Sequence, residues 1–175
     1  MVFNEGQAEQ KILGWKAHLL RYVNQDEVLL EVTNANDESS VLLVQDWGTK
    51  FLPGKFTESQ SDWFAKRGMS SHITVATQRT ENKELQMMTF VHVFQTSNQD
   101  SCAVRSIMKD VIGKLKSHLN QLRSVFYKLD NADCYHCGMF NVWASFPSRR
   151  HGVFVKRLDF SDPQCGKGPC DGKEA

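Results

Sequence analysis

Two short apolar runs in this chain each end in an aspartate, and this arrangement limits the folds that the sequence can adopt. Residues 125–129 (VFYKL) lead into Asp130-Asn131, and residues 41–44 (VLLV) lead into Gln45-Asp46. Short runs of apolar and aromatic residues bounded by polar ones predict buried strands. Open α/β sheets keep their functional side chains at the carboxyl ends of strands. We therefore expect Asp46 and Asp130 at one edge of a sheet, as the basis of a shared metal site.

The segments around these runs predict further strands. Residues 72–77 (HITVAT) and 85–95 (LQMMTFVHVFQ) predict a hairpin, because the polar residues 79–83 lie between them. Apolar residues occupy both alternating sets of positions in 85–95, which predicts a strand covered on both faces. Its His92 is expected to be a hydrogen-bonded core histidine, with metal ligation as the alternative. Residues 153–160 (VFVKRLDF) predict the last strand.

Helical segments separate the strands. Residues 101–122 carry apolar side chains at helical spacing and predict a long amphipathic helix with Asp100 or Ser101 as its N-cap. A shorter helix is expected within residues 137–146. Both segments are long enough for parallel crossovers, so the two strands that end in aspartate can lie side by side. The fold class expected is α/β, a mixed five-stranded sheet flanked by helices.

Length and charge set the broad class of the protein. A chain of 175 residues with a net charge of +1 fits one domain, and any nucleic-acid contact must come from a local basic face. We expect a helical lead-in over residues 1–40, broken near Asn24, and the α/β core over 41–175. The first ten residues lack the pattern of a signal peptide, and no apolar run approaches the roughly 20 residues that span a bilayer. An intracellular protein without a membrane segment is expected.

Two groups of residues have both a functional and a structural interpretation. The five cysteines, an odd number, favour free thiols over disulfides. The alternative is zinc binding by the Cys134-Tyr135-His136-Cys137 group together with Cys165 and Cys170. The insertion 47–71 mixes aromatic residues with Lys and Arg, a composition that can stack bases and hold phosphates. Packing of these aromatic residues onto the sheet is the alternative.

The order of elements and the motifs resemble the ribonuclease-H-like catalytic core of retroviral integrases and DDE/D-type transposases. The resemblance covers residues 41–175 and rests on Asp46, on Asp130-Asn131-Ala132, and on Gly152-Val153 followed by residues 163–167 (PQCGK) and Asp171. Residues 63–68 (WFAKRG) are also similar to transposon-derived proteins of animal genomes. The third acid is Asp where Glu is commoner, and it lies one residue further from Pro-Gln than in integrases. Asp162 and, less favourably, Asp159 are rivals for that position.

The resemblance implies a function and a set of site residues. Metal-dependent DNA cleavage and strand transfer would use Asp46, Asp130 and Asp171 as catalytic and metal-binding residues, with Mg²⁺ or Mn²⁺ as cofactor. It also implies nuclear localisation and allows a homo-oligomer. Asn131 would cap or orient the turn, and His136 could touch a phosphate. The residues expected to contact DNA are Lys66, Arg67, Arg149, Arg150 and Lys167.

Two other functions fit the same sequence. The chain ends four residues after Asp171, so we also expect a last helix too short to hold this acid and consider a catalytically inactive, transposon-derived domain that binds nucleic acid or protein. A cellular ribonuclease H would need a further carboxylate on the first helix of the core, for which Asp110 is the candidate. Retained metal binding distinguishes an enzyme from an inactive domain.

Overall fold

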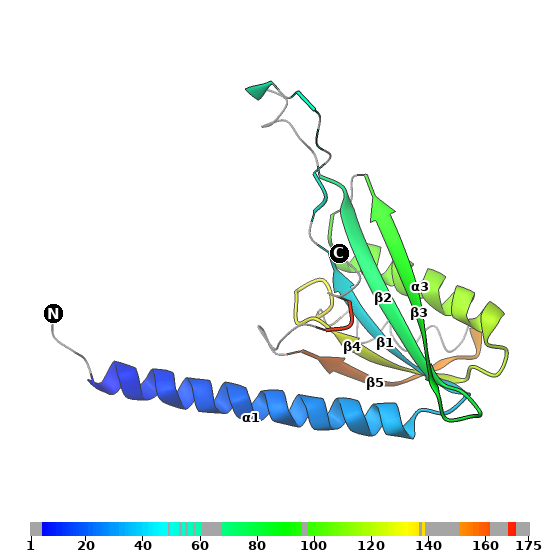
Figure 1. Cartoon of the computed structure of the whole chain (residues 1–175), viewed down its shortest axis with the longest axis horizontal. Helices are drawn as coiled ribbons and strands as arrows, with labels where there is room; N and C mark the ends of the chain where they lie inside the picture. Colours follow the sequence, from blue (N-terminus) through cyan, green and yellow to red (C-terminus); the bar gives the residue numbers. More distant parts are fainter. Residues whose placement is uncertain are drawn as a thin grey trace.

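The computed structural model describes residues 5–48, 50–52, 54, 56–57, 59–60, 68–95, 98–136, 138, 151–161 and 168–170. In chain order the named elements are α1 (Glu5–Ala35), β1 (Ser40–Trp47), β2 (Ser70–Arg79), β3 (Leu85–Phe94), α3 (Ser101–His118), β4 (Ser124–Leu129) and β5 (Phe154–Phe160). Figure 1 shows the strands side by side, with α3 against the sheet and much of α1 projecting beyond it. No helix in the described part of the chain is long and apolar enough to cross a membrane.

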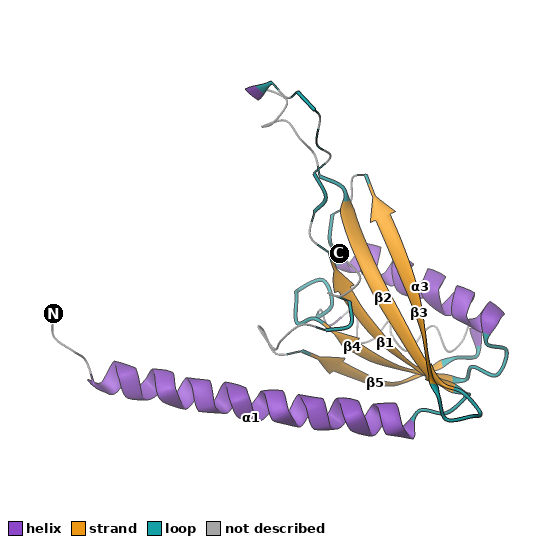
Figure 2. Ribbon diagram, in the orientation of Figure 1, coloured by secondary structure: helices purple, strands orange, loops and turns teal. Residues whose placement is uncertain are grey.

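The five strands form a single mixed sheet in the order β3-β2-β1-β4-β5 (Figure 2). β2 is antiparallel to both β1 and β3, whereas β1 with β4 and β4 with β5 are parallel. This strand order, with one antiparallel strand beside β1, is the ribonuclease-H-like α/β arrangement. The predicted hairpin and the predicted pairing of the two Asp-ended strands are confirmed.

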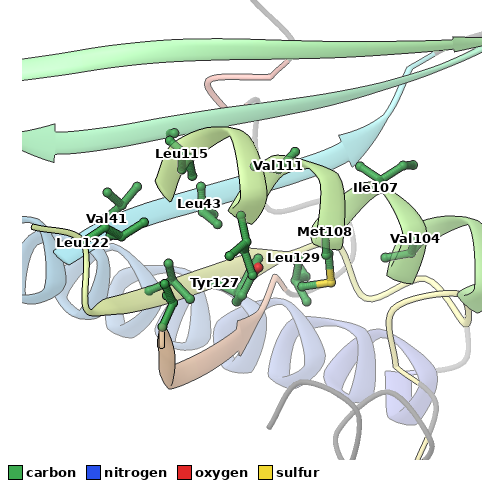
Figure 3. Packing of buried hydrophobic residues seen from close by; sticks show 14 of the residues in the cluster. Val41, Leu43, Val104, Ile107, Met108, Val111, Leu115, Leu122, Tyr127 and Leu129 are labelled. Carbon is green, nitrogen blue, oxygen red and sulfur yellow. The ribbon is translucent and has the colours of Figure 1, made fainter. Parts of the chain in front are cut away.

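Helix α3 builds the main core on one face of the sheet. Its buried residues recur at helical spacing and pack on β1 and β4 (Figure 3): Val104, Ile107, Met108, Val111, Ile112 and Leu115. Fully burying one such side chain contributes about 1.5–3 kcal/mol, so this face holds most of the stabilisation that α3 provides. Asp100 is the N-cap, and its Oδ1 accepts a hydrogen bond from the Ala103 N–H at 2.9 Å.

Helix α1 covers part of the opposite face. Val28, Leu29 and Val32 pack against a second apolar cluster that includes Leu42 and Ile73. The expected break near Asn24 is wrong, because α1 is continuous over 31 residues. Residues 20–28 contain neither Gly nor Pro, so the polar Asn24 and Gln25 do not interrupt the backbone hydrogen bonds.

The expectation that β3 is covered on both faces is also wrong. Its even-numbered residues Met88, Phe90 and Phe94 pack on the α3 side of the sheet. On the other side Met87 and Val93 are 61% and 60% exposed. β3 is an edge strand of this sheet, and the apolar residues on its second face do not pack against α1.

Candidate active site

The register of the sheet brings the two predicted aspartates together. The parallel pairing of β1 with β4 ends at Gln45 opposite Leu129, so Asp46 and Asp130 come next at the same end of adjacent strands. Alternate residues of a strand face opposite sides of the sheet. Asp46 therefore shares the face of Val44, and Asp130 follows the same alternation from Lys128. Both lie on the α1 side of the sheet.

Each carboxylate is oriented by the backbone that follows it. Asp46 Oδ1 accepts a hydrogen bond from the Trp47 N–H at 2.7 Å, and Asp130 Oδ1 accepts one from the Asn131 N–H at 2.8 Å. Asp46 is half-buried and Asp130 is exposed. Carboxylates held in this way at a solvent-accessible sheet edge have the ligand chemistry that Mg²⁺ prefers.

The loop after Asp130 closes back onto the sheet. Ala132 begins a helical turn in which its carbonyl oxygen accepts the N–H groups of Tyr135 at 2.9 Å and His136 at 3.1 Å. The phenol of the buried Tyr135 then forms a 2.9 Å hydrogen bond with Nε2 of His72 on β2. The backbone N–H of Asn131 donates to Asp130 Oδ1 in this turn, a contact that does not depend on its side chain, so the expected capping or orienting role of Asn131 stays a prediction.

His72 and Tyr135 form a buried polar contact beside the two carboxylates. Burial, with a smaller effect of His92, lowers the pKa of His72 to about 3. Burial raises the pKa of Tyr135, and negative charge at Cys134, Asp46 and Asp130 raises it further. The ring of Trp47 lies edge-on to His72 with the centroids 4.9 Å apart. This contact joins the Asp130 loop to the strand beside β1.

The sequence reasoning did not identify this His72–Tyr135 contact. The two residues are 63 positions apart, and no local periodicity links them. The available signal was the position of each residue: Tyr135 follows Asp130 by five residues, and His72 lies in a strand that is mostly buried. A polar side chain in a buried strand requires a hydrogen-bond partner.

The residues proposed as the third acid have different positions. Asp171 and Asp162 lie outside the described residues. The neighbour of Asp171, Cys170, is buried, and its Sγ–H donates to the Val44 carbonyl oxygen at 3.4 Å. Asp159 is described and lies on β5, where its Oδ1 is 2.8 Å from Nε of Arg157.

The described residues contain no group of three or more His, Cys, Asp or Glu side chains that could hold a metal ion. Of the three carboxylates expected at the site, Asp46 and Asp130 are described, and their role as metal ligands stays a prediction. Cys102, Cys134 and Cys170 are reduced and form no disulfide, and the other two cysteines lie outside the described residues. Zinc binding by cysteine therefore has no support in the part of the chain that is described.

All five residues expected to contact DNA lie outside the described residues: Lys66, Arg67, Arg149, Arg150 and Lys167. Sequence reasoning missed three cations that are described on β4 and β5. Lys156 Nζ lies 5.5 Å from the ring centroid of Phe126, which packs with the α1-side cluster. Lys128 and Arg157 line a pocket of about 210 Å³ between α1 and these strands. The signal for Lys128 was alternation along the strand, because this residue precedes Asp130 by two positions.

Asp110 takes part in a separate contact on the α3 side of the sheet. Its Oδ2 is 2.7 Å from Lys114 Nζ and 2.9 Å from Nε2 of His92. Both hydrogen bonds lower the pKa of Asp110, and the bond from Lys114 has the larger effect. His92 is thus hydrogen-bonded as expected, and Asp110 is half-exposed and paired on the face opposite to Asp46. This placement does not supply the extra carboxylate of a cellular ribonuclease H.

Comparison with known proteins gives a family and a set of solved structures. No curated protein sequence matches the chain. The Mos1 transposase paired-end complex with left transposon end has a TM-score of 0.45 and 13% identity, covering 79% of this chain and 41% of that one. The Mos1 mariner paired-end complex with Mn has a TM-score of 0.44 and 10% identity, with coverage of 79% and 42%.

The chain spans about two fifths of the length of these transposases. A family model matches residues 25–175, which include the sheet, α3 and the part of α1 that packs on the sheet. The chain therefore belongs to the family described as a domain of unknown function (DUF8701).

Proposed function

We propose that this domain cleaves and transfers DNA strands with divalent metal ions, in the manner of transposases and integrases. The observation that carries the proposal is the placement of Asp46 and Asp130 at the carboxyl ends of two adjacent parallel strands and on one face of the sheet. Phosphodiester chemistry at a two-metal site needs carboxylates that converge on such an edge.

The third carboxylate in this proposal is Asp171. Its support is the position of the preceding residue, because Cys170 is buried over β1 and β2, with Sγ 3.4 Å from the Val44 carbonyl and 3.8 Å from that of Ile73. Val44 is two residues before Asp46 and on the same face. Asp159 is a poorer choice, since its carboxylate already pairs with Arg157. Asp162 remains the rival to be tested by substitution.

The protein groups have distinct roles in this proposal. Bound Mg²⁺ or Mn²⁺ would activate the attacking oxygen and stabilise the leaving oxygen of the phosphodiester. Asp46 and Asp130 would hold the ions, each kept in place by the N–H of the next residue. The Tyr135 hydrogen bond to His72 would fix the Asp130 loop relative to β1. Lys128, on the same face as Asp130, would attract the DNA backbone.

A plasmid-nicking assay tests this function. Supercoiled DNA is incubated with the chain and Mn²⁺, and Asp46→Asn, Asp130→Asn, Asp171→Asn and Asp162→Asn are compared with the wild type. Glu81→Gln is the matched control, because it removes an exposed carboxylate in the turn between β2 and β3, at the far end of the sheet.

We expect nicking in the wild type and the control, and loss in the first three variants. Nicking that persists in Asp130→Asn refutes the site. DNA binding without nicking, unchanged by Mn²⁺, favours the alternative of a catalytically inactive, transposon-derived binding domain. Loss of nicking in Asp162→Asn, with nicking retained in Asp171→Asn, would identify Asp162 as the third acid in place of Asp171. The proposed function would be unchanged.

A further inference from the structure

A pocket of about 210 Å³ lies between helix α1 and the sheet. Four apolar side chains, three from one face of α1 and one from β1, contribute to its wall: Val28, Leu29, Val32 and Leu42. A hydrogen bond joins the walls from α1 and β5, in which Gln25 Nε2 donates to the Phe160 carbonyl oxygen at 3.2 Å. An apolar cavity of about 150 Å³ is enough to hold benzene. This pocket therefore has room for one ring and a small polar group.

The polar part of the pocket contains a lysine on an inner strand of the sheet. Lys128 belongs to β4, which lies between β1 and β5, and it is half-buried on the face that α1 covers. Its neighbours across the strands are Val44 on β1 and Asp159 on β5. The Asp159 carboxylate pairs with Arg157, whose Nε lies 2.8 Å from Oδ1. Within the described part of the chain, the Lys128 ammonium group has neither an ion-pair nor a hydrogen-bond partner.

The charges around the pocket favour an anionic ligand. Two cations and one acid line it, namely Lys128, Arg157 and Asp159, so its side chains carry an excess of one positive charge. Taking an ammonium group partly out of water costs free energy unless a counter-charge or hydrogen-bond acceptors replace the lost hydration. Asp159 does not fill this role for Lys128, because it is engaged by Arg157. A bound anion would supply the acceptor, and the apolar wall favours an apolar group beside it.

We propose that this pocket binds a small organic anion in which one apolar or aromatic ring carries a phosphate or carboxylate group. The ring packs against Leu29 and Leu42, and the anionic group accepts a charge-assisted hydrogen bond from Lys128. A nucleotide of a DNA strand and a free aromatic acid both have this chemistry. Lys128 precedes Asp130 by two residues on the same face of the sheet, so the ligand would lie beside the proposed active site. The binding itself requires neither metal ions nor cleavage.

Titration of the whole chain with phenyl phosphate, followed by ¹H–¹⁵N NMR without divalent ions, tests the site. We expect shift changes centred on Leu29 and Lys128 and a dissociation constant in the millimolar range, as a ligand with about eleven non-hydrogen atoms allows. Benzyl alcohol has the same ring but no charge, and we expect its binding to be at least about tenfold weaker.

A substitution at Lys128 tests the role of its charge. Lys128→Met should weaken the binding of phenyl phosphate about tenfold, because it keeps an apolar stem and removes the ammonium group. Lys109→Met is the matched control, since Lys109 is exposed on α3, which packs on the other face of the sheet. Shift changes that do not saturate by about 50 mM phenyl phosphate overturn the proposal. Equal affinity for benzyl alcohol, unchanged affinity in Lys128→Met, or equal weakening in the control also overturns it.

Competition with a single-stranded DNA oligonucleotide identifies the source of the ligand. Displacement of phenyl phosphate would assign the pocket to a nucleotide of the DNA strand, and retention at saturating oligonucleotide would assign it to a free small molecule. Either result keeps the proposed chemistry of the ligand. Absence of nicking in the plasmid assay would leave the titration unchanged, so failure of the proposed function and failure of this site are distinguishable.

Discussion

The buried His72 makes a specific prediction for the dependence of stability on pH. Its side chain is fully buried, and burial lowers the pKa of His72 from its usual 6.5 to about 3. Between these two values the unfolded chain binds a proton at His72 that the folded chain does not bind. Acid therefore favours the unfolded state, and the stabilisation present above pH 6.5 is lost as the pH falls toward 3.

The size of the effect follows from the two pKa values. Each pH unit within this window costs about 1.4 kcal/mol, so the free energy of unfolding falls by about 2 kcal/mol between pH 7 and pH 5. We expect His72→Gln to remove this loss, because the amide does not titrate. The amide can also accept the hydrogen bond of the Tyr135 hydroxyl, which keeps the variant close to the native contact.

Urea denaturation at pH 7 and at pH 5 measures the difference for the wild type and for His72→Gln. His118→Gln is the control, because His118 is exposed in the last turn of α3. We expect the wild type and the control to lose about 2 kcal/mol more than His72→Gln over this interval. Equal losses in all three proteins would refute the assignment of a buried, neutral His72.

Two further predictions concern the contacts that support the site. Tyr135→Phe leaves His72 Nε2 without its buried partner, and we expect a loss of about 1–3 kcal/mol of stability in urea denaturation and weaker Mn²⁺ binding. A loss of stability without any change in Mn²⁺ affinity would separate this contact from the site. Leu115→Ala removes a fully buried side chain between α3 and the sheet, and we expect a cost of about 2–5 kcal/mol by thermal or urea unfolding. A cost below about 1 kcal/mol would contradict the packing described, because such values belong to exposed positions.

The parts of the fold that could be predicted from the sequence have strong local signals. The helical spacing of apolar residues in 101–122 predicted α3, which ends at His118, four residues earlier than expected. Two apolar runs that each stop at an aspartate, joined by segments long enough for crossovers, predicted the adjacent ends of β1 and β4. The local sequence pattern and the lengths of the connecting segments were sufficient to predict both α3 and the adjacent strand ends.

Other features depend on contacts that the sequence does not encode locally. The exposure of one face of β3 follows from where α1 lies, and alternation alone cannot show which face a helix covers. The hydrogen bond between Tyr135 and His72 joins segments that are distant in sequence. The expected third acid, Asp171, and the five expected DNA-contacting residues lie outside the described part of the chain, so those expectations stay predictions.

Calorimetric titration with Mn²⁺ tests the central claim most directly, because it requires no knowledge of the DNA sequence. We predict binding by the wild type and by Glu81→Gln, and at least a tenfold weaker affinity in Asp46→Asn and in Asp130→Asn, since each change removes one of the two carboxylates at the ends of β1 and β4. Equal Mn²⁺ affinity in all four proteins, or no binding by any of them, would contradict a metal site at this edge of the sheet.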